Sequence, residues 1–280
     1  MTSSVQGSRS TGRCLSSLRR SRKTRAGSDL LCEWVYRPVA HVVVLALLPL
    51  RVPPPLVVAA SGAAGVAGAV ELARGHLVVA ALLVQLKTVL DNADGQLARL
   101  SGQVTAFGRY LDSEVDLLVD AALLAALGWY TANGLAACVA FLSLTAVLSV
   151  NFNVERLYRA ERDTGAGTAD GSEARPTALL RRLYGLAYAP QDRLVERFIA
   201  WRLRDALPEA RLAYHDRATV SVLANMGMTP QLAAFGICVA LDRPLAFVWI
   251  TVGELAAVGA LALRRELLLR GFGSLQEEAW

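Results

Sequence analysis

Long apolar runs dominate the pattern of this chain, and six of them approach the length of a helix that spans a membrane. Such a helix needs about 20 mostly apolar residues to cross the hydrocarbon core. The predicted spans are residues 56–73, 76–90, 105–130, 134–152, 218–241 and 245–263. The second span passes into DNADGQLARL and the third opens with GRYLDSEVD, so both carry acids that a simple anchor would lack. We therefore predict an all-α integral membrane protein with six transmembrane helices.

The segment before the first span predicts an N-terminal interfacial amphipathic helix. Residues 34–51 are apolar but too short and interrupted for a span, which favours a helix lying in the membrane surface. Three prolines follow at 53–55, and proline suits the first turn of a helix. The first span, 56–73, is rich in Gly and Ala, which indicates close packing against neighbouring helices.

The composition agrees with a membrane protein. Hydrophobic residues make up 54% of the chain and charged residues only 19%, against about 45–50% and about 25% in ordinary soluble domains. These values exclude a disordered chain, a coiled coil and a disulfide scaffold. The four cysteines form no C-x-x-C pair and the three histidines stand far apart, so neither a zinc site nor a disulfide framework is indicated.

The distribution of Lys and Arg predicts the orientation in the membrane. Cytoplasmic loops carry an excess of these residues. With the basic N-terminus inside, the outer loops would be 72–76, 130–133 and 242–244, which contain only Arg74 and Arg243. We therefore expect a multi-pass protein of the plasma membrane with both termini and the active site on the cytoplasmic side. No signal peptide is predicted.

The chain divides into four predicted segments. Residues 1–33 form a basic tail expected to be disordered, and residues 34–160 contain the interfacial helix and the first four spans. Residues 161–217 form a cytoplasmic linker with amphipathic helices, and residues 218–280 contain the last two spans and a tail. Within the third segment, residues 163–175 are expected to form a flexible linker, followed by Arg-rich amphipathic helices at 177–188 and 193–207. These helices either lie on the inner membrane face or pack on each other, and the pattern does not decide between these.

Four carboxylates gather at the inner ends of the second and third spans. Asp91 and Asp94 are three residues apart and Asp112 and Asp116 four apart, so each pair shares one helix face. A turn around residues 101–103 would make the two helices antiparallel and set the pairs against each other. Each Asp deep in a membrane costs roughly 2.5–3.5 kcal/mol, so a cation must offset the cluster. Oxygen ligands favour a hard divalent ion such as Mg²⁺, and paired metals suit phosphoryl transfer.

Small and basic residues lie beside these acids. Gly95 and Ala98 would leave room for a ligand next to the metals, and Arg99 can place its guanidinium near a phosphate. Gly108, one turn before Asp112, permits close approach of a helix or a substrate. Lys87 lies one turn before Asp91, where it could balance a motif acid or Asp120. We expect a structural pair with Asp120, and a role in acceptor binding is the alternative.

The string Asp91-x-x-Asp94-Gly95-x-x-Ala98-Arg99, followed after eight residues by Gly108, then Asp112 and Asp116, is similar to a known signature. It matches every position of the signature of the CDP-alcohol phosphotransferase (CDP-alcohol phosphatidyltransferase) family. The resemblance implies a six-helix membrane enzyme with an N-terminal interfacial helix, usually a homodimer. It also implies transfer of a phosphate-containing group from a CDP-linked donor to an alcohol, with release of CMP and with Mg²⁺ or Mn²⁺ as two bound ions.

The same resemblance implies roles for individual residues. Asp91, Asp94 and Asp112 correspond to metal ligands, and Asp116 corresponds to the general base that also faces the second metal. A carboxylate that takes the proton of an alcohol makes it a better nucleophile. The positions that contact the CDP moiety of the donor are Asp91, Gly95, Ala98, Arg99 and Gly108.

The resulting hypothesis is transfer of a phosphatidyl group from CDP-diacylglycerol to an alcohol acceptor. Candidate acceptors are glycerol 3-phosphate, an inositol or inositol phosphate, serine and phosphatidylglycerol, and Arg109, Arg156 and Arg159 are candidates to bind an acceptor phosphate or to remain solvated. The alternative is transfer of a phosphoalcohol from a soluble CDP-alcohol to diacylglycerol or another acceptor. A membrane cation transporter or an inactive family member is a second alternative. Membrane lipids and a second copy of the chain are the expected partners, and no nucleic acid is expected.

Overall fold

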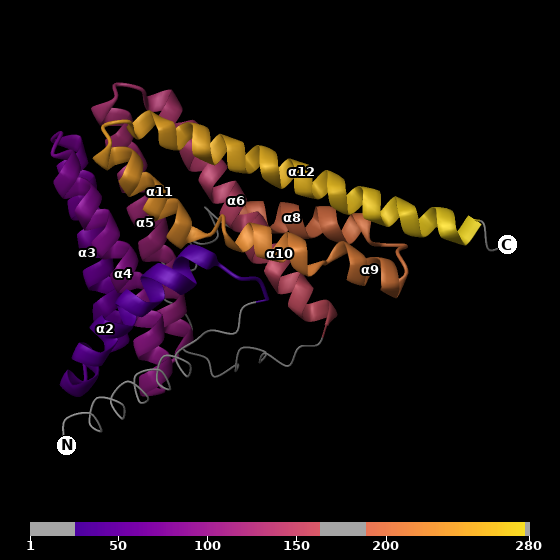
Figure 1. Cartoon of the computed structure of the whole chain (residues 1–280), viewed down its shortest axis with the longest axis horizontal. Helices are drawn as coiled ribbons and strands as arrows, with labels where there is room; N and C mark the ends of the chain where they lie inside the picture. The colour runs from indigo at the N-terminus through magenta and orange to yellow at the C-terminus, as the bar shows by residue number, and fades with distance from the viewer. Residues whose placement is uncertain (1–25, 163–188, 278–280) are drawn as a thin grey trace, which may run out of the picture.

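The computed structural model describes residues 26–162 and 189–277, and all regular elements in those two ranges are helical (Figure 1). The predicted all-α fold is confirmed. The N-terminal elements are the π-helix η1 (Cys32–Tyr36), α2 (Arg37–Leu47) and the 3₁₀ helix η2 (Leu48–Leu50). The long helices are α3 (Pro54–Ala73), α4 (Leu77–Ser101), α5 (Ala106–Tyr130), α6 (Gly134–Glu161) and α12 (Pro244–Glu277). Between α6 and α12 lie α8 (Ala189–Arg202), α9 (Pro208–Tyr214), α10 (Arg217–Ala224) and α11 (Met228–Ala240).

Several helices have the length and composition to cross a membrane, as expected of a multi-pass protein. These candidates are Cys32–Leu50, Pro54–Ala73, Gly134–Glu161, Pro208–Ala240 and Pro244–Leu269. Helices α4 and α5 are long enough but carry Lys87 and the acids of the motif, so composition alone does not select them. The six predicted spans coincide with α3, α4, α5, α6, the α10–α11 pair and α12, and their number stays a prediction.

The three loops predicted to face outward lie together at one end of the bundle, at the upper left of Figure 1. Tyr130, at the end of α5, donates a hydrogen bond from its hydroxyl to Asp242 Oδ1 in the α11–α12 loop at 2.9 Å. A Cβ built on Gly75, in the α3–α4 loop, would lie 3.6 Å from the ring of Tyr130. The turn that carries the acidic motif joins the opposite ends of α4 and α5.

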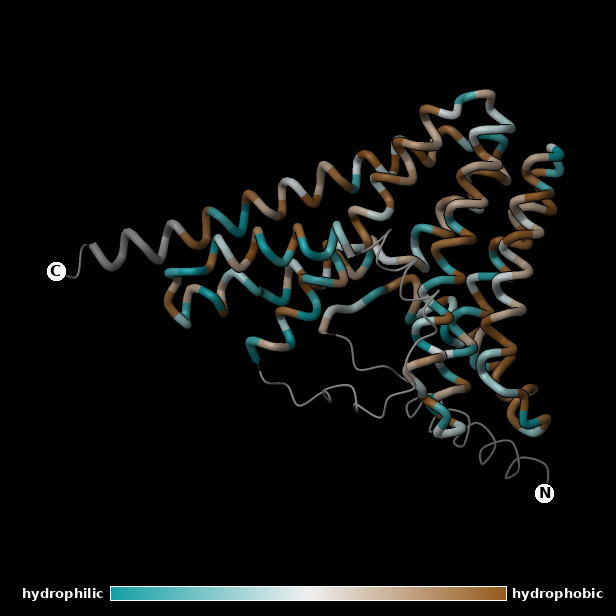
Figure 2. The backbone as a smooth tube through the Cα atoms, turned by 180° about the vertical axis from the view of Figure 1, so that it is seen from behind, coloured by the Kyte–Doolittle hydropathy of each residue, from teal (hydrophilic) through white to brown (hydrophobic). Residues whose placement is uncertain are grey.

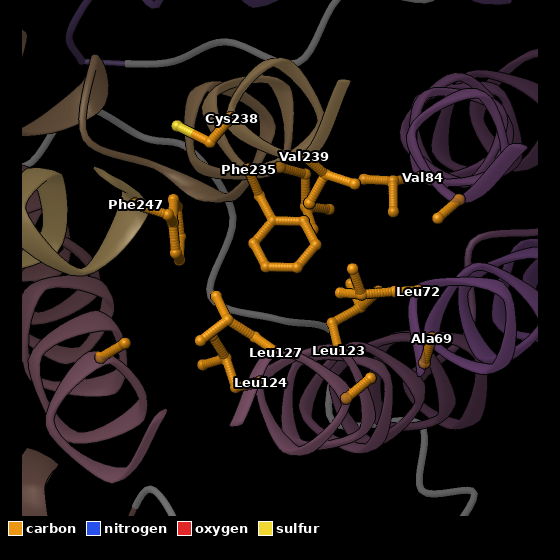
Figure 3. Packing of buried hydrophobic residues seen from close by; sticks show 14 of the residues in the cluster. Ala69, Leu72, Val84, Leu123, Leu124, Leu127, Phe235, Cys238, Val239 and Phe247 are labelled. Carbon is orange, nitrogen blue, oxygen red and sulfur yellow. The ribbon is translucent and has the colours of Figure 1, made fainter. Parts of the chain in front are cut away.

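The largest hydrophobic core joins α3, α4, α5, α6, α11 and α12. In Figure 3, Phe235 of α11 lies among Leu72, Leu123 and Val84, and its ring meets Phe247 of α12 edge to face, with the centroids 5.1 Å apart. The helix α12 is mostly hydrophobic along its first half, whereas hydrophilic residues are frequent in α8 (Figure 2). The core therefore packs α4 against α3 and α11, and α5 against α3 and α6, and these two helices carry the acids.

The glycines of α3 allow the close packing that its composition predicts. A Cβ built on Gly65 would lie 2.4 Å from Val119 Cγ1, and one built on Gly62 would lie 2.7 Å from Val115 Cγ1. Real Cβ atoms do not approach so closely. The absence of side chains at these two positions lets the backbone of α3 approach α5, one helix of the acidic motif.

The prediction of a single helix over residues 218–241 is wrong. Helix α10 ends at Ala224 and α11 begins at Met228, because Gly227 adopts an extended conformation with ψ 179°. The side chain of Asn225 binds the N-terminal segment across this break, since its amide donates to the carbonyl of Ser28 and its oxygen accepts from the amide of Leu30. The residue at this break therefore connects the start of the described chain to the helix bundle by two hydrogen bonds.

The segments on either side of the bundle follow the predictions in part. The elements η1, α2 and η2 cover the predicted interfacial helix and bury one face against α4. Together they have the length and composition of a membrane span, so their interfacial position stays a prediction. Helix α6 continues to Glu161, beyond the predicted end of its span, and α8 corresponds to the second predicted Arg-rich helix. The predicted linker at 163–175, the first predicted Arg-rich helix at 177–188 and residues 1–25 of the predicted tail lie outside the described residues. The remainder of that tail, residues 26–33, was expected to be disordered, but it enters a helix at Leu30 and buries Asp29 and Cys32.

Candidate active site

Two helices joined by a short turn bring the predicted acids together. Gly102 ends α4 in the left-handed conformation with φ 68°, which glycine adopts without steric cost. Thr105 then caps α5, because its hydroxyl oxygen accepts from the amide of Gly108 at 3.0 Å. This local sequence reverses the chain and sets Asp91 on α4 against Asp112 and Asp116 on α5.

Three of the four predicted acids converge on one point. One carboxylate oxygen from each of Asp91, Asp112 and Asp116 lies within 4.8 Å of the other two. All three side chains are partly exposed, so a ligand can reach them. Oxygen donors at this separation fit a hard divalent cation, which carboxylates coordinate readily.

Asp94 lies beside this group but outside the set of three. Its side chain is only 5% exposed, and its Oδ2 atom has no hydrogen-bond partner among the described residues. An orphaned carboxylate oxygen in a buried position costs free energy unless a donor or a cation reaches it. The oxygen-only donors and this unpaired atom together fit the metal that the motif implies.

Lys87 occupies the space between the acids, and its ion pairs are with the motif acids, the other partners that the sequence left open, rather than with Asp120. The side chain of Lys87 is 1% exposed, and its ammonium donates to Asp91 Oδ1 at 3.2 Å and to Asp116. Lys87 shares a helix face with Asp91 one turn later, so the chain directs its ammonium to the motif acids. The position of Lys87 four residues before Asp91 was the sequence signal for this contact.

The small residues of the motif leave room for Arg99. A Cβ built on Gly95 would lie 3.3 Å from Nη1 and 3.5 Å from Nη2 of Arg99, so the guanidinium lies over the backbone of Gly95. Ala98 is partly exposed on the same helix. At Gly108, the nearest contact that a built Cβ would make with the described residues is the hydroxyl oxygen of Thr105, the capping residue of α5, at 3.2 Å. Among the described residues, the surface at Gly108 is therefore open to a ligand, whereas the guanidinium of Arg99 lies over Gly95.

Polar residues between the motif positions bond α4 to η1, α2 and α11, and the sequence analysis did not identify them. Asn92 accepts a hydrogen bond from the thiol of Cys32 at 3.1 Å and donates to Thr229 Oγ1 at 3.3 Å. Gln96 donates to the carbonyl of Arg37 at 3.1 Å, and its oxygen lies 3.1 Å from His41 Nδ1. Side chains of η1, α2 and α11 therefore fix the helix that carries Asp91 and Asp94. Polar residues between motif acids were the available signal.

The three arginines that the sequence offered for binding an acceptor phosphate differ in their partners and exposure. Arg156 pairs with Glu196 of α8 and donates to Asn153 Oδ1 at 3.1 Å. Arg159 pairs with Glu155, one turn earlier on α6, at 2.6 Å. Arg109 is exposed on α5. The structure therefore gives each of the two α6 arginines a carboxylate partner.

Comparisons with known proteins agree with the motif. Residues 42–204 match the sequence model of the CDP-alcohol phosphatidyltransferase family. The chain is 34% identical over 113 residues to a phosphatidylinositol phosphate synthase of Corynebacterium glutamicum, covering 40% of this chain and 52% of that protein. It is 29% identical over 164 residues to the protein of the same name from Mycobacteroides abscessus, covering 58% of this chain and 74% of that protein. The chain thus spans about half the length of the first of these relatives.

A crystal structure of Mycobacterium tuberculosis phosphatidylinositol phosphate synthase with CDP-DAG bound is also similar. The sequences are 20% identical, the match covers 76% of this chain and 94% of that chain, and the TM-score is 0.35. At this TM-score, the positions of residues in that structure are not transferred to this chain.

Proposed function

Because this chain belongs to the CDP-alcohol phosphatidyltransferase family, we propose that it transfers a phosphatidyl group from CDP-diacylglycerol to an alcohol and releases CMP. The observation that carries the proposal is the convergence of Asp91, Asp112 and Asp116 within a complete family motif. An inositol phosphate is the first acceptor to test, because the relatives from Corynebacterium glutamicum and Mycobacteroides abscessus are named phosphatidylinositol phosphate synthases.

The acids of the motif would hold Mg²⁺ or Mn²⁺. Asp91, Asp112 and Asp116 offer converging oxygens, and Asp94 adds a buried oxygen that lacks a donor. When bound there, two such ions offset the negative charge of the donor's pyrophosphate as CMP leaves. Among the described residues, this is the group of acids whose carboxylate oxygens lie close enough together to bind one metal ion.

Asp116 is the proposed general base. It would accept the proton of the acceptor hydroxyl, whose oxygen then attacks the phosphorus of the phosphatidyl group while the bond to the CMP oxygen breaks. Lys87 donates to Asp116 in the structure, so it orients this carboxylate and offsets part of its charge. The contact also keeps Asp116 directed toward Asp91, at the centre of the group.

The CDP moiety would bind along the surface of α4. Arg99 lies over Gly95 and can donate two parallel hydrogen bonds to a phosphate. The small side chains of Gly95 and Ala98 would leave room for the CDP moiety on α4, and Gly108 would leave room on the facing end of α5. Asp91 would contact the CDP moiety where both bind the metal. We further propose that the active site faces the cytoplasm, in the plasma membrane, and that the enzyme is a homodimer.

The experiment is CMP release by the purified protein with CDP-diacylglycerol, Mg²⁺ and an inositol phosphate. We expect CMP release that stops on addition of EDTA and in Asp116→Asn. The exposed acid Asp205 supplies the matched control, and Asp205→Asn should keep full activity. Full activity of Asp116→Asn would refute the proposed base. CMP should also inhibit the reaction, which a cation transporter would have no reason to show.

A further inference from the structure

A small pocket lies inside the helix bundle, where residues of α5, α6, α11 and α12 meet. Its two polar members are Asp120 of α5 and Gln231 of α11, and here it is called the Asp120–Gln231 pocket. Figure 3 labels four of its apolar members, which are Leu123, Leu124, Phe235 and Phe247. All six side chains are buried, so the pocket belongs to the interior of the protein.

Each polar side chain of the pocket has an oxygen without a hydrogen-bond donor. Asp120 is 2% exposed and Gln231 is 1% exposed. Among the described residues, no group donates to Asp120 Oδ2 or to Gln231 Oε1. Buried polar atoms in native proteins almost always have a partner, because an unpaired one costs free energy. Two such oxygens on one pocket therefore indicate a donor that reaches both of them.

The side-chain donors beside these oxygens are already engaged. Lys87 is the basic residue whose charge reaches Asp120, but its ammonium donates to two acids of the motif. The side-chain amide of Gln231 donates to Glu254 on α12. If the amide group of Gln231 were turned over, its oxygen would face the carboxylate of Glu254, which is unfavourable. Neither Lys87 nor Gln231 can therefore satisfy Asp120 Oδ2.

The size of the pocket selects a very small ligand. The space open to the centre of a water molecule is about 10 Å³, and one internal water needs about 10–15 Å³. A divalent cation would need about six oxygen ligands, whereas the residues that line the pocket besides Asp120 and Gln231 are apolar. The pocket therefore suits one water molecule rather than a metal ion.

We propose that one water molecule occupies the Asp120–Gln231 pocket and donates one hydrogen bond to Asp120 Oδ2 and the other to Gln231 Oε1. A water molecule has two protons to donate, and the two unpaired atoms are both acceptors. Internal waters make about 2–4 hydrogen bonds to buried polar groups. This site is separate from the proposed metal ligands and does not depend on which donor or acceptor the enzyme uses.

The water molecule would connect the two helices of the acidic motif to one common neighbour. Asp120 lies one turn after Asp116 on α5, so the water joins α5 to α11. Helix α11 already contacts α4, because Thr229 Oγ1 accepts from the side chain of Asn92 at 3.3 Å. Helix α11 is thus bonded to α4 directly and to α5 through the water, which helps to position the two sets of acids.

The direct test is solid-state NMR of the full chain in lipid bilayers, with ¹³C-labelled glutamine and magnetisation transferred from water protons. Transfer to the side-chain carbonyl carbon of Gln231 should develop severalfold faster than transfer to that of Gln96. Each signal is assigned by its loss in Gln231→Met or Gln96→Met, since methionine keeps the length of the side chain. Equal rates of transfer to the two carbons would overturn the proposal.

Gln96 is the matched control because it is equally buried but bonded to protein atoms at both ends. It is 2% exposed, its amide donates to the carbonyl of Arg37 at 3.1 Å, and its oxygen lies 3.1 Å from His41 Nδ1. Fast transfer to Gln231 therefore reports a bound water and not general access of solvent to buried glutamines.

A double-mutant cycle tests whether the two oxygens share one partner. Asp120→Leu and Gln231→Met should each lower the melting temperature, because each leaves the water and the other oxygen with one contact fewer. The double variant should melt higher than the sum of the two shifts predicts, since a pocket without polar atoms stays dry. Strict additivity would contradict a shared water.

The same variants separate a water from a proton held by Asp120. If Asp120 were protonated and donated directly to Gln231, the cycle would still show coupling, but transfer from water to Gln231 would be as slow as transfer to Gln96. That result would overturn the proposal. In Asp120→Leu the fast transfer to Gln231 should be lost, and its persistence would show that Asp120 does not hold the water.

Discussion

At the scale of single residues, Lys87 provides positive charge within a group of carboxylates that would otherwise repel one another. It contacts Asp91 and Asp116 and is almost completely buried. Removing one partner of a buried ion pair typically costs about 3–5 kcal/mol, because the remaining charge is left without compensation. Lys87→Met should therefore lower the melting temperature in EDTA, and Mg²⁺ should restore more of it than it adds to the wild type.

The control for this prediction keeps the charge. Lys87→Arg should melt nearer the wild type in EDTA than Lys87→Met does. An equal effect of Mg²⁺ on the melting temperatures of Lys87→Met and the wild type would show that Lys87 and the metal do not offset the same charges.

A substitution at Gly95 should change the activity of the protein without lowering its stability. Alanine at this position favours the helix by about 0.5–1 kcal/mol over glycine, and the nearest atoms are the flexible end of Arg99, 3.3 Å from the added carbon. Gly95→Ala should therefore keep or raise the melting temperature. It should also raise KM for CDP-diacylglycerol severalfold, because Arg99 must move from the surface proposed to bind the pyrophosphate.

The matched control for Gly95 is Gly259 on α12, where a built Cβ meets no atom of the described residues within 4 Å. Gly259→Ala should give the helix the same advantage and leave KM unchanged. If Gly95→Ala shows an unchanged KM, Arg99 does not bind the donor from its present position.

At the scale of elements, the packing of α3 on α5 depends on two glycines that face valines, and the closer of the two contacts is that of Gly65 with Val119. A Cβ on Gly65 would lie 2.4 Å from Val119 Cγ1 and 3.2 Å from Val119 Cβ, and valine has a stiff side chain. Gly65→Ala should lower the free energy of unfolding by about 1–3 kcal/mol through overpacking. Val119→Ala should rescue part of that loss in the double variant, although it opens a cavity by itself.

The measurement is a double-mutant cycle on thermal or denaturant unfolding in detergent. Coupling between the two sites is expected because they share one contact. Strict additivity of the two changes would contradict the packing of Gly65 on Val119.

At the scale of the whole molecule, the structure groups the three Arg-poor loops at one end, and the membrane should separate them from α9. Asp242 lies in the α11–α12 loop and Glu209 in α9, and both are exposed. In a background with Cys14→Ser and Cys138→Ser, a membrane-impermeant maleimide should label Asp242→Cys in intact cells. Glu209→Cys should react only after the cells are opened. The reverse pattern would invert the predicted orientation.

The sequence determined the helices and the chemistry at their ends. Apolar runs of membrane length predicted α3, α6 and α12, and the spacing of Asp91, Asp94, Asp112 and Asp116 placed acids on two facing helices, because both features repeat locally along the chain. Contacts between distant segments escaped this reasoning. The choice of the motif acids rather than Asp120 as the partners of Lys87, and the hydrogen bonds that join Asn92 to Cys32 and Thr229, depend on which helices lie side by side.

Tertiary structure alone decided those features for a physical reason. A helical period states which face a side chain occupies, but a hydrogen bond or an ion pair forms only where another segment supplies its partner. Asn225 ends α10 against residues 28–30, almost two hundred residues earlier in the chain. The motif could be recognised from one stretch of sequence, whereas the partners that orient it come from η1, α2 and α11.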